Sequence, residues 1–146
     1  MKTEVLQILS NGGWTPERRL DKNVIIKMIE KENYDAFPKV VEFLQSFEGL
    51  SFKFLNKRSL KEDNFDFCFD RSIELEVPER LNEDYEPRIG KKLCLIGTAY
   101  RDYMVLMMAE DGFVYGGYDN FLVEIADSGI KAIEGIIKDY DFKRID

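Results

Sequence analysis

The period of the apolar residues changes twice along this chain, and that change constrains the fold more than any other feature. Up to residue 47, apolar residues recur at the spacing typical of amphipathic helices. From Leu50 the period becomes two, as in half-buried strands, and after residue 128 it is helical again. Helices at both ends predict an α+β fold: an antiparallel-rich central sheet with the N-terminal helices and a C-terminal helix packed on one side.

The expected helices have recognisable ends. They span residues 2–10, residues 22–33, a stretch from Pro38 to Gly49, and residues 128–139. Asp21 is placed to cap the second helix, and Asp127 or Ser128 is placed to cap the last one. Pro38 stands at the first position of the third helix, where its missing N–H group costs nothing.

Strand signals fill the middle of the chain. The expected strands span residues 50–55, 65–69, 93–99, 103–109 and 113–118. The apolar run from Leu93 to Ala99 predicts a strand in the centre of the sheet. Asp111-Gly112 predicts a tight hairpin turn, because that turn needs a positive φ. Gly116-Gly117 is expected to break or bulge the last of these strands.

Four segments have weaker signals. Apolar residues alternate with Glu74 and Glu76 until Pro78 stops the run, which resembles a short strand. Residues 82–87 form an acidic loop or the start of a helix, and residues 121–126 are ambiguous. The tail from residue 139 to residue 146 is expected to be loosely held.

Length and composition indicate one domain, covering residues 1–146. The chain has 146 residues, of which 45% are apolar, enough for a sizeable core. No run approaches the roughly 20 apolar residues of a membrane span. The first residues, Met1 to Glu4, carry charge and no apolar stretch of signal-peptide length. We therefore expect a cytoplasmic protein that does not bind membranes.

The residue inventory excludes several kinds of site. There is no histidine, which removes the commonest general base and the commonest imidazole ligand. Two cysteines cannot form a thiolate–imidazole zinc site. Cys68 and Cys94 both lie in apolar runs, which favours reduced, buried thiols over a disulfide or a reactive thiol. Glycine patterns for nucleotide phosphates are also missing. We expect no cofactor and no resident metal.

Two carboxylate pairs keep one enzymatic alternative open. Asp66 and Asp70 would share one face of a strand, and so would Glu74 and Glu76. Either pair would bind a divalent cation if a third carboxylate converged on it. Because no convergence is visible in the sequence, a solvated sheet face is the preferred interpretation, and a metal-dependent enzyme is the less favoured one.

Acidic charge is concentrated in the middle of the chain. The net charge is −7 overall, while residues 62–127 carry sixteen acidic and six basic side chains. Such a segment repels phosphate backbones, so we expect no direct nucleic-acid binding, and it attracts a basic protein. An ordinary solubilising surface would have a similar composition.

Five tyrosines lie in or beside this acidic segment. Tyrosine is enriched at protein interfaces, although it is also common in sheets. Acidic and tyrosine side chains together predict a surface for a basic protein partner. The predicted partner-binding residues are Asp66, Asp70, Glu83, Asp84, Tyr85, Glu86, Glu110, Asp111, Tyr115, Tyr118 and Asp119.

Several short motifs follow one another in an order that is characteristic of a known family. The first is Gly13-Trp14-Thr15-Pro16-Glu17-Arg18-Arg19, whose tryptophan we expect to pack on the helix that follows it. The others are Phe37-Pro38, Phe43-Leu44, Phe47-Glu48-Gly49-Leu50, Tyr85-Glu86, Ile89 to Gly97, and Glu110 to Tyr115. In this order they resemble the third subgroup of the SUKH superfamily of bacterial immunity proteins. Glu48 stands where that family often has glycine.

The resemblance implies an immunity protein without catalytic activity. Such proteins bind and neutralise a cognate polymorphic toxin domain, often a nuclease or another nucleic-acid-directed enzyme, in the bacterium that produces it. The resemblance and the acidic charge together predict a basic toxin domain as the partner. The exposed strands leave open whether a monomer or a weak homodimer binds it. A regulatory scaffold that binds other proteins is the alternative, because the wider superfamily includes proteins with signalling roles.

Overall fold

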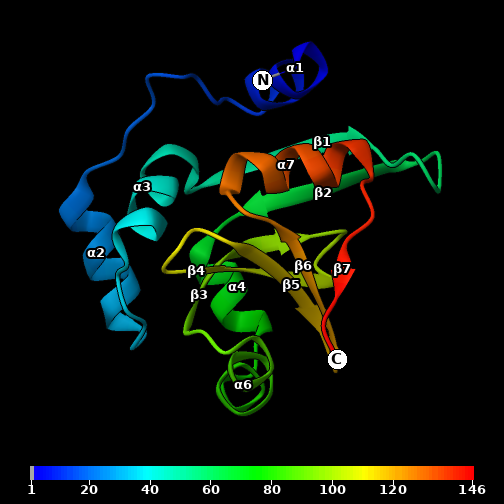
Figure 1. Ribbon diagram of the computed structural model, residues 1–146. Coiled ribbons are helices and arrows are strands. Elements are labelled where there is room, and N and C mark those ends of the chain that lie inside the picture. The colour runs from blue at the N-terminus through cyan, green and yellow to red at the C-terminus, as the bar shows by residue number, and fades with distance from the viewer. Residues whose placement is uncertain (1) are drawn as a thin grey trace.

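The computed structural model describes residues 2–146 (Figure 1). The helical elements are α1 (Thr3–Asn11), α2 (Lys22–Lys31), α3 (Pro38–Phe47), α4 (Phe69–Leu75), α5 (Pro78–Arg80), the π-helical turn η1 (Leu81–Tyr85), α6 (Glu86–Ile89) and α7 (Gly129–Lys138). The strands are β1 (Leu50–Leu55), β2 (Glu62–Phe67), β3 (Leu93–Ala99), β4 (Met104–Ala109), β5 (Val114–Tyr118), β6 (Phe121–Ala126) and β7 (Lys143–Arg144). The predicted α+β class is confirmed.

All seven strands form one antiparallel sheet, in which spatial order follows the order along the chain. Every residue of β3 is buried, as expected for a central strand. The ambiguous segment 121–126 is a strand. The tail is not loosely held, because Lys143 pairs with Glu124 and adds β7 to the edge of the sheet.

The helix ends agree with the sequence signals. The Asp21 carboxylate accepts the N–H groups of Asn23 and Val24 at the start of α2. Ser128 caps α7 by accepting the N–H of Lys131. Local capping chemistry therefore fixed where these helices begin.

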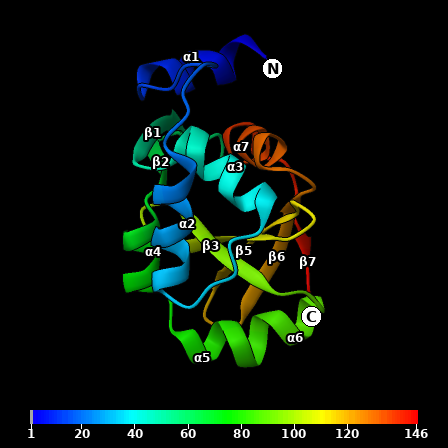
Figure 2. The same cartoon turned by 90° about the vertical axis from the view of Figure 1, so that its left-hand side faces the viewer.

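Helices cover both faces of the sheet. On one face, the Phe43 ring of α3 lies 5.0 Å from the Phe67 ring of β2 and packs over Gly129 at the start of α7. This confirms that N-terminal and C-terminal helices share one side. On the other face, Tyr85 of η1 packs against Gly117 of β5. Figure 2 shows α5 and α6 at the opposite end of the molecule from α1.

The two central glycines of β5 lie within the regular strand. The register shift in the pairing of β5 with β6 falls two positions earlier than expected, between Val114 and Tyr115. A Cβ atom on Gly117 would lie 2.7 Å from Tyr85 Cζ, and one on Gly116 would collide with Met104 from the opposite face. These glycines therefore make room for side chains on both faces of the sheet.

Stacked rings fill the core beneath α3. We call Trp14, Phe43, Phe47, Phe52, Phe65 and Phe67 the aromatic cluster. Trp14 is buried as predicted, but it stacks on Phe47 of α3, at 5.5 Å between ring centroids, and not on the helix that follows it. Phe47 in turn stacks on Phe43 at 4.8 Å. Such pairs add about 0.5–1.5 kcal/mol each beyond the burial of their area.

Residues 69–77 do not form the expected strands. Phe69 ends the alternation of β2 and starts α4, because the Glu48 carboxylate accepts its N–H at 3.2 Å. Phe69 and Ser72 of α4 and Glu76 directly after it are buried, at the spacing of one helical face. The same sequence thus satisfies a period of two and a helical period. Pro78 ends no strand; it starts α5 instead.

Candidate binding surface

The predicted partner-binding residues lie in separate places on the molecule. Glu110 and Asp111 lie in the turn before β5, whereas Tyr118 ends β5 and Asp119 follows it. A strand of this length separates the two turns by roughly 16 Å. Asp70 lies at the start of α4, which follows β2. No single contiguous patch therefore holds the whole predicted set.

Two of the predicted contact residues are buried. Tyr85 has no exposed surface, and its hydroxyl donates to the backbone oxygen of Asp119 at 2.7 Å. Tyr115 is 2% exposed, and its hydroxyl lies 2.9 Å from Lys91 Nζ. Burial also raises the pKa of Tyr85 to about 12. Both side chains hold the fold together, and neither is placed to anchor a partner.

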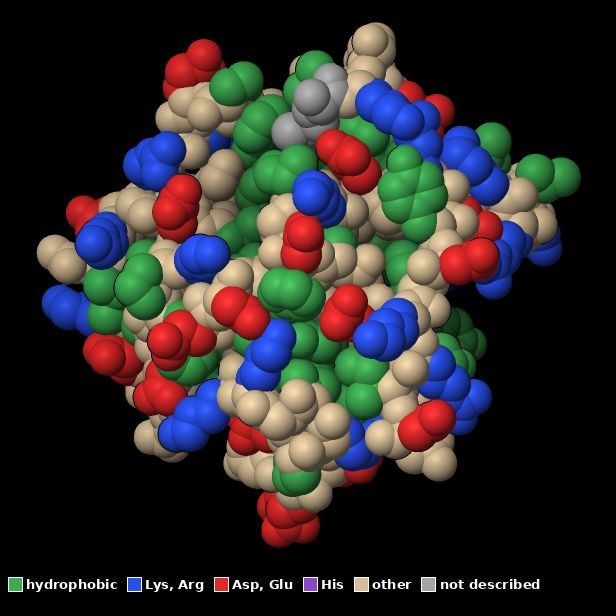
Figure 3. Space-filling view, in the orientation of Figure 1, with side chains coloured by type: hydrophobic (Ala, Val, Ile, Leu, Met, Phe, Trp, Pro, Cys, Tyr) green, Lys and Arg blue, Asp and Glu red, His purple; other side chains and the backbone are tan. Residues whose placement is uncertain are grey.

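Basic neighbours already compensate several of the predicted acidic residues. Asp111 pairs with Lys91 at 2.7 Å, and Asp84 pairs with Arg88 at 3.1 Å. Arg80 approaches Asp119 at 3.9 Å. On the face seen in Figure 3, acidic and basic side chains alternate and do not segregate. In the folded protein, basic side chains therefore neutralise part of the acidic charge that is concentrated in the sequence.

Asp66 belongs to a polar network between β2 and the β3–β4 turn. It accepts Asn64 Nδ2 at 2.9 Å, and its partial burial raises its pKa. Beside it, Asp102 has a left-handed φ of 67° and accepts Thr98 Oγ1 and Arg71 Nη2, each at 2.9 Å. These contacts stabilise the turn conformation that a non-glycine residue adopts at a cost.

An acidic cleft of about 470 Å³ lies between the α2–α3 connection, the α4–α6 segment and the start of β3. Its charged lining comprises four carboxylates and one ammonium group. The residues that line the acidic cleft are Glu32, Asn33, Tyr34, Asp35, Ile73, Glu76, Pro78, Asn82, Glu86, Lys92 and Leu93. Of these, only Glu86 belongs to the partner-binding set predicted from the sequence.

Glu76 is the least satisfied polar group of the cleft. Its side chain is 1% exposed. One carboxylate oxygen, Oε1, accepts the N–H of Val77 at 2.7 Å and lies 4.0 Å from Arg80 Nη1. The other, Oε2, has no hydrogen-bond partner within residues 2–146. Burial raises the pKa of Glu76, although the Val77 N–H and Arg80 act in the opposite direction.

Two of the other cleft carboxylates, Glu86 and Asp35, have polar partners. Glu86 accepts the N–H of Leu93 at 2.7 Å, which joins α6 to the start of β3. Asp35 lies 3.4 Å from Lys92 Nζ, in an exposed pair. Tyr34 forms an aromatic wall and meets Phe69 edge to face at 6.2 Å. The cleft thus combines one apolar wall with an excess of negative charge.

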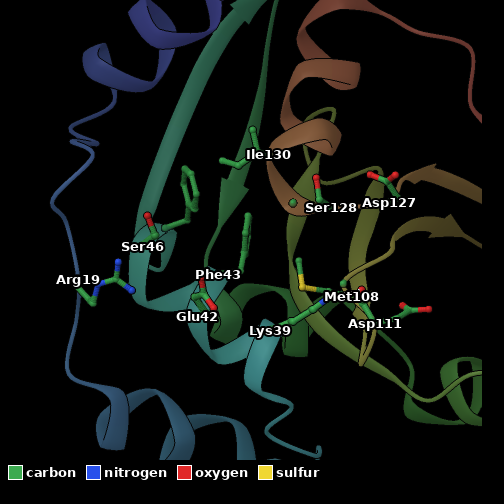
Figure 4. A pocket seen from close by; sticks show the side chains of 13 residues that line it. Arg19, Lys39, Glu42, Phe43, Ser46, Met108, Asp111, Asp127, Ser128 and Ile130 are labelled. Carbon is green, nitrogen blue, oxygen red and sulfur yellow. Dashed lines mark hydrogen bonds between the residues drawn. The ribbon is translucent and has the colours of Figure 1, made fainter. Parts of the chain in front are cut away.

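A second hollow, of about 380 Å³, lies between α3 and the start of α7 (Figure 4). Phe43 and Ile130 form apolar parts of its wall. Lys39 lies at its rim and donates to the backbone oxygen of Asp111 at 3.1 Å. Because its charged residues have both signs and its buried polar atoms are paired, this groove makes a weaker case for a charged ligand.

The carboxylate pairs considered for metal chemistry do not converge. Across the part of the chain that the structure describes, no group of three or more Cys, Asp or Glu side chains is arranged to hold a metal ion. Glu74 faces solvent and pairs with Arg71, while Glu76 is buried, so the two no longer share one face. Both cysteines are free thiols, and burial raises the pKa of Cys94 to about 12.

The comparisons with known proteins identify a family. The sequence model of the SUKH-3 immunity protein family matches residues 1–139. Searches of the curated proteins and of the solved structures found no significant match. Among the described helices, none is both long and apolar enough to cross a bilayer. The chain belongs to the SUKH-3 immunity protein family, which supports an immunity function.

Proposed function

We propose that this SUKH-3 family member protects the bacterium that makes it by binding a cognate toxin domain in the cytoplasm and blocking it. The family match over residues 1–139 carries the proposal. The mechanism is stoichiometric inhibition, so the protein needs no catalytic group of its own. The absence of histidine from the sequence is consistent with that role.

The proposed toxin domain is basic, as expected of a nuclease or another enzyme that acts on nucleic acid. The net charge of −7 favours such a partner over nucleic acid itself. Opposite charges would steer the encounter, with association rates approaching about 10⁸–10⁹ M⁻¹s⁻¹ at low salt. Because the steering is electrostatic, the association rate falls as salt is added.

We place the contact at the acidic cleft and the exposed carboxylates around it. Glu83 lies in η1, directly before the cleft residue Glu86 at the start of α6. Glu110 and Asp111 line a hollow of about 440 Å³ together with Lys91 and Lys92, and Lys92 also lines the cleft. This assignment keeps part of the surface predicted from the sequence and omits the buried tyrosines.

Affinity purification from the native cells tests the proposal. Tagged protein is recovered at mild salt, and the proteins that co-purify are identified by mass spectrometry. The expected result is a stoichiometric, basic toxin domain that kills cells when expressed alone and is harmless when the immunity protein is co-expressed. Recovery of housekeeping proteins only, from cells shown to produce a candidate toxin, would contradict immunity and favour the scaffold alternative.

A further inference from the structure

The starting observation is a buried carboxylate that is only half satisfied. Glu76 Oε2 has no partner among the described residues, although its side chain is almost entirely inaccessible. Buried polar groups in native proteins are nearly always hydrogen-bonded, and an exception calls for an explanation. Glu76 lines the acidic cleft, so a ligand that enters the cleft and displaces the groups covering Oε2 would supply the missing donor.

The nearest cation does not supply that donor. Arg80 Nη1 lies 4.0 Å from Glu76, at the outer limit of an ion pair, and it faces the other carboxylate oxygen. The same nitrogen lies 3.9 Å from Asp119, so Arg80 is shared between two carboxylates. The Val77 N–H also bonds to Oε1. Within the described chain, every polar contact of the Glu76 carboxylate is therefore made through Oε1.

The cleft has the chemistry that suits an organic cation on an aliphatic stem. Glu32, Asp35, Glu76 and Glu86 outnumber the single ammonium of Lys92, so the cleft favours positive charge. Tyr34 adds an aromatic ring to the lining, and apolar surface packs well along the methylene groups of Lys or Arg. Its volume of about 470 Å³ falls within the range of about 300–1,000 Å³ for ligand pockets.

We infer that the acidic cleft receives a lysine or arginine side chain of the toxin, whose N–H groups donate to Glu76 Oε2. This inference rests on the proposed function, which supplies a basic protein partner. Lys and Arg carry only donors, which is what a carboxylate oxygen without a partner requires. A metal ion is a poorer occupant, because the carboxylates within residues 2–146 do not converge as a ligand set.

Glu76→Gln and Glu74→Gln form a matched pair of variants. Both neutralise one glutamate without changing its size, and the two positions are two residues apart. Glu74 is exposed and pairs with Arg71 outside the cleft. A structural role for Glu76 predicts a lower melting temperature for Glu76→Gln. The ligand role predicts weaker cation binding with an unchanged or higher melting temperature, because a buried charge has been removed.

The first experiment uses small probes and needs no toxin. Isotope-labelled protein is titrated with N-acetyl-arginine amide, N-acetyl-lysine amide and the uncharged N-acetyl-norleucine amide, and backbone resonances are followed by NMR. We expect saturable shifts at cleft residues with the two cations only, in roughly the millimolar range. Glu76→Gln should weaken this binding at least tenfold, and Glu74→Gln less than twofold. Shifts scattered over the surface, or equal binding to both variants, would overturn the inference.

The second experiment measures the affinity of the co-purified toxin domain for both variants. We expect Glu76→Gln to weaken binding at least tenfold, because a buried carboxylate that pairs across an interface carries much of the affinity. Tight toxin binding that is equal for both variants would overturn the cleft inference and leave the proposed function standing. Probe binding in the cleft, with no toxin recovered from producing cells, would instead overturn the proposed function.

Discussion

In the aromatic cluster, rings from the N-terminal segment, α3, β1 and β2 stack on one another, and the Trp14 N–H donates to Ser46 Oγ at 2.9 Å. In the acidic cleft, by contrast, Glu76 keeps a buried oxygen without a partner anywhere in residues 2–146. The contacts of the aromatic cluster stabilise the fold. The buried oxygen of Glu76 destabilises it, and such a cost is expected at a site that must bind another molecule.

The largest expected effect tests the aromatic cluster. Phe67→Ala removes a ring that is 2% exposed and contacts the rings of Phe43, Phe47 and Phe52. We expect the free energy of unfolding to fall by about 3–5 kcal/mol, as measured by urea denaturation. Tyr103→Ala, at a side chain that is 75% exposed, is the control. A loss as small as that of the control would show that the cluster does not dominate stability.

A smaller effect is expected where the N-terminal segment is tied to the end of α3. Arg18 donates to the backbone oxygens of Ser46 and Glu48, each at 2.7 Å. Arg18→Met should cost about 1.5–3 kcal/mol, because it removes charge-assisted bonds and leaves two carbonyl groups without their donor. Arg19→Met, at the exposed neighbouring position, should change stability by under about 0.5 kcal/mol. Equal effects would rule out a structural role for the Arg18 bonds.

The third prediction concerns the pH dependence of stability. It rests on Glu48, directly after α3. Burial raises the pKa of Glu48 to about 7, while the Phe69 N–H acts in the opposite direction. The folded state therefore holds a proton that the unfolded state releases near pH 4.5. The resulting stability is present in full below that value and is lost as the pH rises through about 7.

Urea denaturation at about pH 5 and about pH 8 tests this assignment. The wild type should lose on the order of 1 kcal/mol more than Glu48→Gln across that interval. The glutamine keeps an oxygen that can accept the Phe69 N–H, so the variant should fold. Glu42→Gln, on the exposed side of α3, is the matched control. Parallel losses in the wild type and Glu48→Gln would show that Glu48 is not the group that titrates.

Local signals predicted most of the fold. The apolar period, Asp21, Pro38 and Ser128 placed the main helices, because caps and periods act over a few residues. The prediction of strands within residues 69–77 was wrong, because this sequence fits both a period of two and a helical period. The choice depends on Glu48, which lies 21 residues from Phe69 along the chain. No local pattern contains that contact.

The candidate site was harder to predict than the fold. The acidic cleft joins Asp35, Glu76 and Lys92, which are far apart in the sequence and meet only after folding. The sequence indicated the acidic excess but not which carboxylates would be paired. Tyr85 and Tyr115 were predicted as contacts from their residue type, yet the core buries both. Tyrosine suits a packed sheet as well as an interface, so residue type alone could not separate the two roles.

Amide hydrogen exchange of the protein, free and bound to its co-purified toxin domain, tests the central claim most directly. The account predicts new protection in residues 32–35 and 73–86, around the acidic cleft, and unchanged exchange across the aromatic cluster. Protection confined to the groove between α3 and α7, with the cleft exchanging as in the free protein, would contradict it.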